Sequence, residues 1–332
     1  MLRGKDAVAI NGYIRAKPRL LLLSLAAFLI SYCQIFGESP DYGSYDLFFD
    51  SLRWNGLDIF GETRFEPGFT VLGLALVALV SSNPVIYGLI VAGVVFLKGF
   101  VVNLFSSSQA VFYVLVIFYF VRYFPLHELT QLRAATAAAF LLLAVALLWN
   151  EKWAFGLLAG MAAIIFHVSA VFVVPSLFLH PAKRWVVLLI GLVVFVSISL
   201  GVNLLISELA DSVPLVDMYH QGGFGDAPNP ISAALLLDWA MIILGLIMWN
   251  RISPPMKQVL FLEIVGMAIF YGAIDFAVIA HRIRELFSVF WVLFVANGWR
   301  SSFIAKLTSA GFVLASIGLY SYLHFFSGQF FT

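Results

Sequence analysis

The sequence predicts an all-α, polytopic integral membrane protein, and three observations support this fold class. Of the 332 residues, 62% are hydrophobic and only 11% are charged, which leaves too little polar surface for a soluble monomer. Apolar runs of roughly 20 residues, the length that a helix needs to cross a ~30 Å hydrocarbon core, recur along the whole chain. The segments between them are too short for a soluble domain, so we expect one membrane domain over residues 1–332.

The apolar runs between helix breakers predict about eleven membrane-spanning helices. In chain order they cover residues 20–36, 68–82, 84–104, 109–124, 132–149, 154–179, 185–206, 231–249, 257–279, 285–299 and 303–326. Proline and glycine inside these runs are compatible with membrane helices, because neighbouring helices can satisfy the freed backbone groups. The first run follows five cations and is not followed by a small-residue cleavage site, so we interpret it as a retained anchor.

The distribution of lysine and arginine predicts the orientation of these helices. With the N-terminus in the cytoplasm, thirteen of the 19 cations fall on the cytoplasmic side and six on the outer side. The odd number of spans then places the C-terminus on the outer side. We therefore expect a multi-pass membrane protein whose N-terminus is cytoplasmic and whose C-terminus is outside.

Two long connections lie on the predicted outer side, at residues 37–67 and 207–230. Both are rich in acidic residues, whereas the cytoplasmic connections are short, so we expect the polar chemistry on the outer face. The single cysteine, Cys33, excludes a disulfide framework and a cysteine metal cluster. A net charge of +1 gives no indication of a nucleic-acid partner.

The first outer connection, residues 37–67, contains candidate sugar-binding and catalytic residues. Asp41 stands close in sequence to Tyr42 and Tyr45. Aromatic rings next to carboxylates suit a sugar ligand: the C–H face of the sugar stacks on a ring, and the carboxylate accepts hydrogen bonds from its hydroxyl groups. The alternative is that these acids are only solvated. Glu66 differs from them, because it directly precedes Pro67 at the start of an apolar helix, where a proline needs no amide hydrogen. Its carboxylate is thereby held near the membrane interface.

A histidine inside the sixth predicted span is a second candidate. His167 lies in the segment FHVSA, Phe166 to Ala170, and an ionisable residue within a span is by default a functional hypothesis. The alternative is a neutral His167 hydrogen-bonded to a neighbouring helix.

Several cations are candidates for binding an anion. Arg282 and Arg284 stand on the side that should avoid positive charge, and a planar guanidinium binds phosphate through two parallel hydrogen bonds. Asp275 would share a helix face with Arg282, so that one arginine could be structural. Arg64 and Lys98 are further candidates, although Lys98 could extend its ammonium to the interface.

For the other polar residues the sequence indicates either a structural role or no role. Arg133 opens the fifth predicted span on the predicted cytoplasmic side, where the positive-inside rule explains it. Asp238 and Glu263 lie within spans and require cations that the sequence does not identify. The sequence contains no Walker loop, no GxGxxG after a strand, no HExxH, no GxSxG and no Cys/His metal spacing. We therefore expect neither a cofactor nor a metal.

The order of these motifs resembles a known family. DYGSY (Asp41 to Tyr45) follows the first span, EPGF (Glu66 to Phe69) opens the second and LR (Leu132–Arg133) begins a small-residue span. FHVSA and the Arg282–Arg284 cluster follow. Together, over residues 37–290, they resemble the EpsG-like family of Wzy-type bacterial polysaccharide (O-antigen and exopolysaccharide) polymerases. The second periplasmic connection is shorter than is usual in Wzy-type proteins.

The resemblance implies a metal-independent glycosyltransferase with a GT-C-like helical fold. It would be a multi-pass protein of the bacterial inner membrane with a periplasmic C-terminus. There it would join undecaprenyl-pyrophosphate-linked repeat units at the periplasmic face, with a flippase and a chain-length regulator as implied partners. In this interpretation Arg282, Arg284, Arg64 and Lys98 hold the pyrophosphate, and Arg133 joins them through the family match. Glu66, Asp41 or His167 accepts the proton of the acceptor hydroxyl.

Two other classes of function fit part of the sequence. A lipid-linked oligosaccharide flippase or secondary transporter would share the hydrophobicity and the arginines, but transporters often show matched halves, which this sequence lacks. A membrane O-acyltransferase could use a histidine and arginines, but it needs a cytoplasmic acyl donor, for which the predicted inner face offers few residues.

Overall fold

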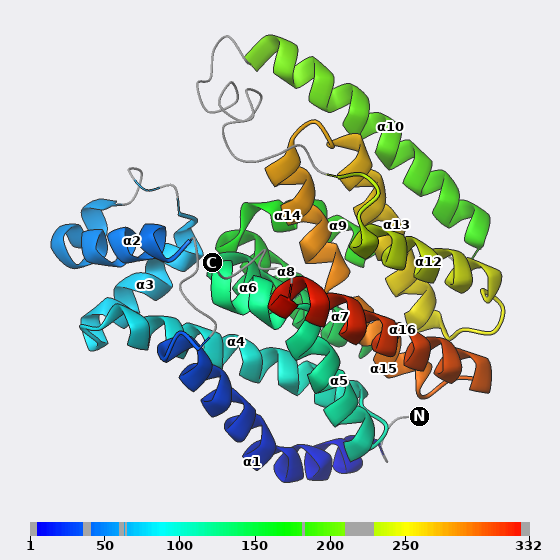
Figure 1. Cartoon of the computed structure of the whole chain (residues 1–332), viewed down its shortest axis with the longest axis horizontal. Coiled ribbons are helices and arrows are strands. Elements are labelled where there is room, and N and C mark those ends of the chain that lie inside the picture. The colour runs from blue at the N-terminus through cyan, green and yellow to red at the C-terminus, as the bar shows by residue number, and fades with distance from the viewer. Residues whose placement is uncertain are drawn as a thin grey trace. The chain divides into compact units, whose positions relative to one another are not determined.

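The chain is built from helices in every part that the structure describes (Figure 1). A computed structural model describes residues 5–35, 41–59, 63, 65–180, 183–209 and 229–326, and these contain no strand. The α-helices are α1 (Lys5–Tyr32), α2 (Tyr42–Asn55), α3 (Pro67–Leu79), α4 (Asn83–Phe105), α5 (Gln109–Arg122), α6 (Phe124–Thr130), α7 (Leu132–Trp149), α8 (Trp153–Phe166), α9 (Val174–Leu177), α10 (Arg184–Leu209), α12 (Ala233–Ile247), α13 (Pro254–Gly272), α14 (Ala277–Ser288), α15 (Trp291–Gly298) and α16 (Phe303–Ser321). The short turns η1 (Gly56–Ile59), η2 (Val168–Phe172) and η3 (Tyr322–Phe326) accompany them. The predicted all-α membrane class is confirmed.

Fewer helices are long enough to cross a membrane than the sequence analysis predicts. In the described residues, five segments are long and apolar enough: α4, α7, residues 184–201 of α10, α13 and residues 303–326. The pair α5 and α6, bent by 64°, makes a sixth if it counts as one span. Helices α3, α8 and α12 have 13 to 15 residues and are only about 20 Å long. The count of eleven is therefore not supported, and the side of the C-terminus, which depended on it, stays a prediction.

The helices form two compact units, which we describe separately. Unit 1 comprises residues 1–168 and 320–332, and unit 2 comprises residues 169–319. In unit 1, α1 and α7 both pack along α4, and α7 forms a hairpin with α8. Buried alanines such as Ala137 and Ala138 allow the neighbours of α7 to approach closely, as small residues do in membrane helix packing.

Unit 2 is organised around α13, which packs against α9, α10, α12, α14 and α15. Figure 1 shows α10 and α13 side by side. Helix α10 is apolar on all sides, yet only 11% of residues 184–201 are buried. Such an outward-facing apolar surface suits contact with lipid.

The predicted periplasmic connection at residues 37–67 contains a helix that the sequence analysis missed. Helix α2 buries Tyr42, Tyr45, Phe49 and Leu52, which recur at three- and four-residue intervals on one face. This face packs against α3, where the rings of Phe49 and Phe69 lie 6.1 Å apart. Most of the second predicted connection, residues 210–228, lies outside the described residues.

Candidate active site

The carboxylate of Glu66 joins the ends of three helices in unit 1. Its Oε2 accepts a hydrogen bond from the guanidinium of Arg133 at 2.7 Å, and its Oε1 lies 3.0 Å from Nδ1 of His167. Oε1 also accepts the backbone N–H of Val168 at 3.3 Å. Glu66 precedes α3, Arg133 lies in the first turn of α7, and His167 ends α8. The structure thus brings together three residues that the sequence analysis predicts for the site.

The sequence EPGF explains how α3 meets the end of α8. Glu66 has an extended backbone, as a residue before proline prefers, and Pro67 begins the helix. A side chain at position 68 would place its Cβ 2.9 Å from the carbonyl oxygen of Ile165, so glycine is needed for this close approach. Phe69 is fully buried. Each residue of the motif therefore helps to place the carboxylate.

Arg133 is held from three directions. Besides the ion pair with Glu66, its guanidinium lies 4.7 Å from the ring centroid of Phe65 and forms a hydrogen bond with Tyr45. Arg133 cannot lie on the opposite side of the membrane from Glu66, as predicted, because the two side chains touch. The prediction failed because a count of cations cannot recognise an arginine that has a carboxylate partner.

Glu66 is ionised over the physiological pH range. Burial opposes ionisation, but the hydrogen bond to His167 and the positive charge of Arg133 outweigh it and lower the pKa of Glu66 to about 2. The contribution of this charge to stability is present above the pKa of an unfolded-state glutamate and is lost as pH falls through about 2. A carboxylate with such a low pKa is a poor proton acceptor, which argues against Glu66 as the base.

His167 presents one nitrogen that is still available. The side chain is 5% exposed, and among the described residues Nε2 is buried without a hydrogen-bond partner. The ionised carboxylate of Glu66 can only accept a hydrogen bond, so Nδ1 of His167 must donate it. In a neutral imidazole the proton therefore resides on Nδ1 and the lone pair on Nε2. A buried polar atom without a partner requires an explanation, and a reacting group of a substrate provides one.

The predicted sugar-binding tyrosines are part of the packing beside this site. The ring of Tyr42 stacks on Tyr87, with centroids 4.8 Å apart, and Tyr45 is only 3% exposed. Neither ring offers an open stacking surface, but Tyr45 reaches the site through its hydrogen bond with Arg133. Asp41 stands immediately before α2 and does not cap it through its side chain.

In unit 2, Arg284 and Arg282 have different surroundings. Arg284 on α14 forms an ion pair with Asp238 on α12 at 2.5 Å, which identifies the cation that Asp238 requires. Arg282 forms no ion pair within the described part of the chain. Asp275 is exposed and precedes α14, so the predicted shared helix face with Arg282 is wrong. The structure distinguishes a neutralised arginine from an unneutralised one.

The side chain of Lys98 is buried instead of extending outward from its helix. Its ammonium pairs with Glu128 on α6, and both side chains are almost completely buried. Beside Glu128, His127 is also buried, and neither of its ring nitrogens has a hydrogen-bond partner in the described residues. We therefore do not retain Lys98 as a phosphate ligand. His127 and Glu128 were not predicted from sequence, although two ionisable residues in the apolar segment FPLHELT were a signal for a buried polar cluster. Arg64 lies outside the described residues.

Comparison with known proteins identifies the family. The structure defines a helical membrane protein with a buried Glu–His–Arg cluster at converging helix ends. The model of the EpsG family matches residues 19–331, and the chain therefore belongs to this family of Wzy-type polymerases. A search of curated proteins and a search of solved structures each gave no match.

Proposed function

We propose that this protein is a polysaccharide polymerase that joins undecaprenyl-pyrophosphate-linked oligosaccharide repeat units at the periplasmic face of the inner membrane. The observation that carries the proposal is the arrangement of Glu66, which holds both Arg133 and His167 while Nε2 of His167 is left without a partner among the described residues. Membership of the EpsG family supports the class of reaction. A GT-C-like arrangement of the helices, with the N-terminus in the cytoplasm and the C-terminus in the periplasm, belongs to the same proposal.

In the proposed reaction His167 is the general base. Its Nε2 takes the proton of the acceptor hydroxyl while the oxygen attacks the anomeric carbon of the donor from the face opposite the pyrophosphate. The bond between the anomeric carbon and the pyrophosphate oxygen breaks, and its electron pair leaves with the pyrophosphate. The new glycosidic bond has inverted configuration. General base assistance of this kind contributes about 10²–10⁴-fold in rate.

Glu66 is a positioning residue in this mechanism. Its carboxylate fixes the tautomer and the orientation of His167, and its negative charge stabilises the imidazolium that forms when Nε2 accepts the proton. Arg133 fixes the second carboxylate oxygen and so prevents rotation of Glu66. The base is therefore oriented by Glu66 of the EPGF motif and, through it, by Arg133 of the LR motif.

Arg282 is the cation that we assign to the leaving pyrophosphate. Arg284 is neutralised by Asp238, whereas Arg282 carries a charge that no described carboxylate compensates. A preorganised cation at the position where negative charge develops contributes about 3–4 kcal/mol to transition-state stabilisation.

Purified protein incubated with lipid-linked repeat units tests the proposal. We expect a ladder of extended products from the wild type, no ladder from His167→Ala, and a wild-type ladder from His180→Gln, a control at an exposed histidine. Movement of single lipid-linked repeat units across a vesicle membrane, without their being joined into chains, would instead identify a flippase. Acyl groups on the sugar would identify an acyltransferase, and either result contradicts the proposal.

A further inference from the structure

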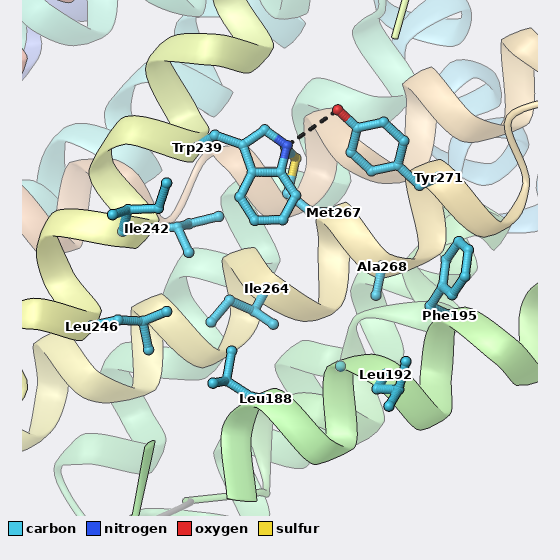
Figure 2. Close-up of a pocket in the computed structure, with 12 residues that line it drawn as sticks. Leu188, Leu192, Phe195, Trp239, Ile242, Leu246, Ile264, Met267, Ala268 and Tyr271 are labelled. Atoms are coloured by element: carbon cyan, nitrogen blue, oxygen red, sulfur yellow. Dashed lines mark hydrogen bonds between the residues drawn. The ribbon is translucent and has the colours of Figure 1, made fainter. Parts of the chain in front are cut away.

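Unit 2 contains an apolar groove between α10 and α12, with α13 as its floor (Figure 2). Its volume is about 340 Å³. Each of the three helices lines it with four residues at the spacing i, i+3, i+4 and i+7, beginning at Leu188, Trp239 and Ile264. A stripe of this spacing is about 10 Å long on a helix. We call this feature the α10–α12 groove, and its shape suits an extended hydrocarbon chain.

One end of the α10–α12 groove is polar. The indole N–H of Trp239 donates to the hydroxyl of Tyr271 at 3.1 Å, and this hydroxyl donates to the carbonyl oxygen of Pro230 at 2.8 Å. Figure 2 shows the Trp239–Tyr271 pair together at this end, with aliphatic side chains such as Leu188 and Leu246 farther along. Tryptophan and tyrosine are enriched where the hydrocarbon of a membrane meets its headgroups. The groove therefore has an apolar body and an end that suits a headgroup.

Helix α14 is tied to the turn of α12 that forms the polar end. Asp238 directly precedes Trp239 on α12 and holds Arg284, so α14 is fixed next to this end of the groove. The same helix carries Arg282, which has no ion-pair partner among the described residues. An anionic headgroup on an apolar chain matches this combination of cation and hydrocarbon surface.

The rims of the groove are accessible to lipid. Leu192 on α10 is 59% exposed and Ile243 on α12 is 53% exposed. Because α10 is apolar on all sides and buries little of its surface, a chain can enter sideways from the bilayer without passing through water.

From these observations we propose that the α10–α12 groove holds the isoprenoid chain of the lipid-linked donor, whose pyrophosphate lies at Arg282. This inference rests on the proposed function, which supplies a prenyl pyrophosphate as the donor. It adds a binding site for the part of the substrate that does not react, and such remote contacts position the reacting atoms.

Photo-crosslinking tests the inference without requiring turnover. Full-length protein in lipid nanodiscs would be irradiated with a diazirine-labelled prenyl pyrophosphate, and the adducts would be mapped by mass spectrometry. We expect adducts within residues 188–195, 239–246 and 264–271, and competition by unlabelled undecaprenyl pyrophosphate. Adducts confined to other helices, or labelling that no competitor reduces, would overturn the assignment. Correct labelling with no chain extension by the wild type would refute the proposed function alone.

Filling the groove tests its contribution to catalysis. Ala268 lines the floor, and Ala268→Leu and Ala268→Phe should narrow the groove in two steps. We expect KM for the undecaprenyl-linked donor to rise on the order of tenfold in Ala268→Phe and less in Ala268→Leu, with little change for a donor whose pyrophosphate carries a methyl group in place of the prenyl chain. Equal KM changes for both donors would contradict the inference.

A second apolar groove provides the matched control. In unit 1, residues of α3, α4, α7 and α8 line a cavity of about 250 Å³ that includes Gly93. A Cβ added at Gly93 meets no atom within 4 Å, so Gly93→Leu is a substitution that directs a side chain into this cavity from an open position. We expect it to leave KM for both donors unchanged. A selective effect of Gly93→Leu together with none of Ala268→Phe would place the chain in unit 1 and overturn the inference.

Discussion

Two buried ion pairs in unit 1 have similar chemistry but different surroundings. Lys98 and Glu128 lie within helices and are 1% and 0% exposed, so that they are sealed from any substrate. Arg133 and Glu66 lie at helix ends, are 17% and 12% exposed, and share their carboxylate with a histidine. The first pair neutralises itself, whereas the second positions a third group whose Nε2 has no partner among the described residues. The comparison shows that burial of charge alone does not define a site: partial exposure at helix ends, and a histidine held by the same carboxylate, distinguish the second pair from the first.

The largest expected effect is a loss of stability when the buried Lys98–Glu128 pair loses one of its two charges. Lys98→Met leaves Glu128 buried without a counterion, and we expect a loss of about 3–5 kcal/mol in the free energy of unfolding. Lys98→Met combined with Glu128→Leu should recover most of this loss, because neither charge is then left alone. Denaturation of the purified protein in detergent measures both variants. A double variant as unstable as the single one would show that the pair does more than neutralise itself.

The second effect concerns the two arginines of α14. Arg282→Ala should lower kcat by about 10²–10³-fold with little change in unfolding temperature, because it removes a cation from the leaving group. Arg284→Ala should instead destabilise unit 2, since it removes the counterion of Asp238, and Asp238→Asn in the same chain should restore part of that stability. Chain-extension assays and thermal unfolding distinguish the two. Equal loss of activity without loss of stability in both variants would contradict the distinction.

A smaller effect is expected at Arg133. Arg133→Lys retains the positive charge but cannot hold Glu66, Tyr45 and the ring of Phe65 at once, so we expect about a tenfold loss of kcat with an unchanged KM. The matched control is Arg251→Lys, at an exposed arginine of unit 2. Wild-type turnover in Arg133→Lys would show that the geometry of the guanidinium does not matter.

The smallest effect is expected at Tyr45. Tyr45→Phe retains the packed ring and removes one hydrogen bond to Arg133, which is worth about 1–3 kcal/mol when a charged group is involved. We expect a small drop in unfolding temperature and less than a tenfold loss of activity. Tyr113→Phe, at an exposed ring, serves as the control. A loss as large as that of His167→Ala would mean that Tyr45 contacts the reacting groups.

The sequence predicts the helical membrane fold well because long apolar runs permit few alternatives. The range 132–149 agrees with α7, and 84–104 agrees with α4 to within one residue at each end. The predicted number of spans was too high because an apolar run can be longer than the helix that it contains. Helix α8, for example, ends at His167, although the apolar sequence continues to residue 179. The amphipathic α2 was missed because polar residues interrupt its apolar ones, as they do in a connection.

The site was predictable only in part, because its geometry depends on contacts distant in sequence. Glu66 and His167 stand out through proline and through their position in an apolar run, but nothing in the sequence shows that they touch. Arg133 entered only through the family motif, since the positive-inside rule assigned it elsewhere. The pairing of Asp238 with Arg284 joins residues 46 positions apart, and no local pattern reveals it.

A double-mutant cycle on Glu66 and His167 tests the central claim, that Glu66 acts through His167, most directly. Chain extension by the wild type, Glu66→Gln, His167→Ala and the double variant would be measured between pH 5 and 8, where Glu66 stays ionised because its pKa is about 2. We expect Glu66→Gln to lose about 10²-fold, His167→Ala to lose more, and the double variant to lose no more than His167→Ala alone. Multiplied losses in the double variant would contradict the account, because the two residues would then act independently. Full activity of His167→Ala with collapse of Glu66→Gln would also contradict it and would make the carboxylate itself the base.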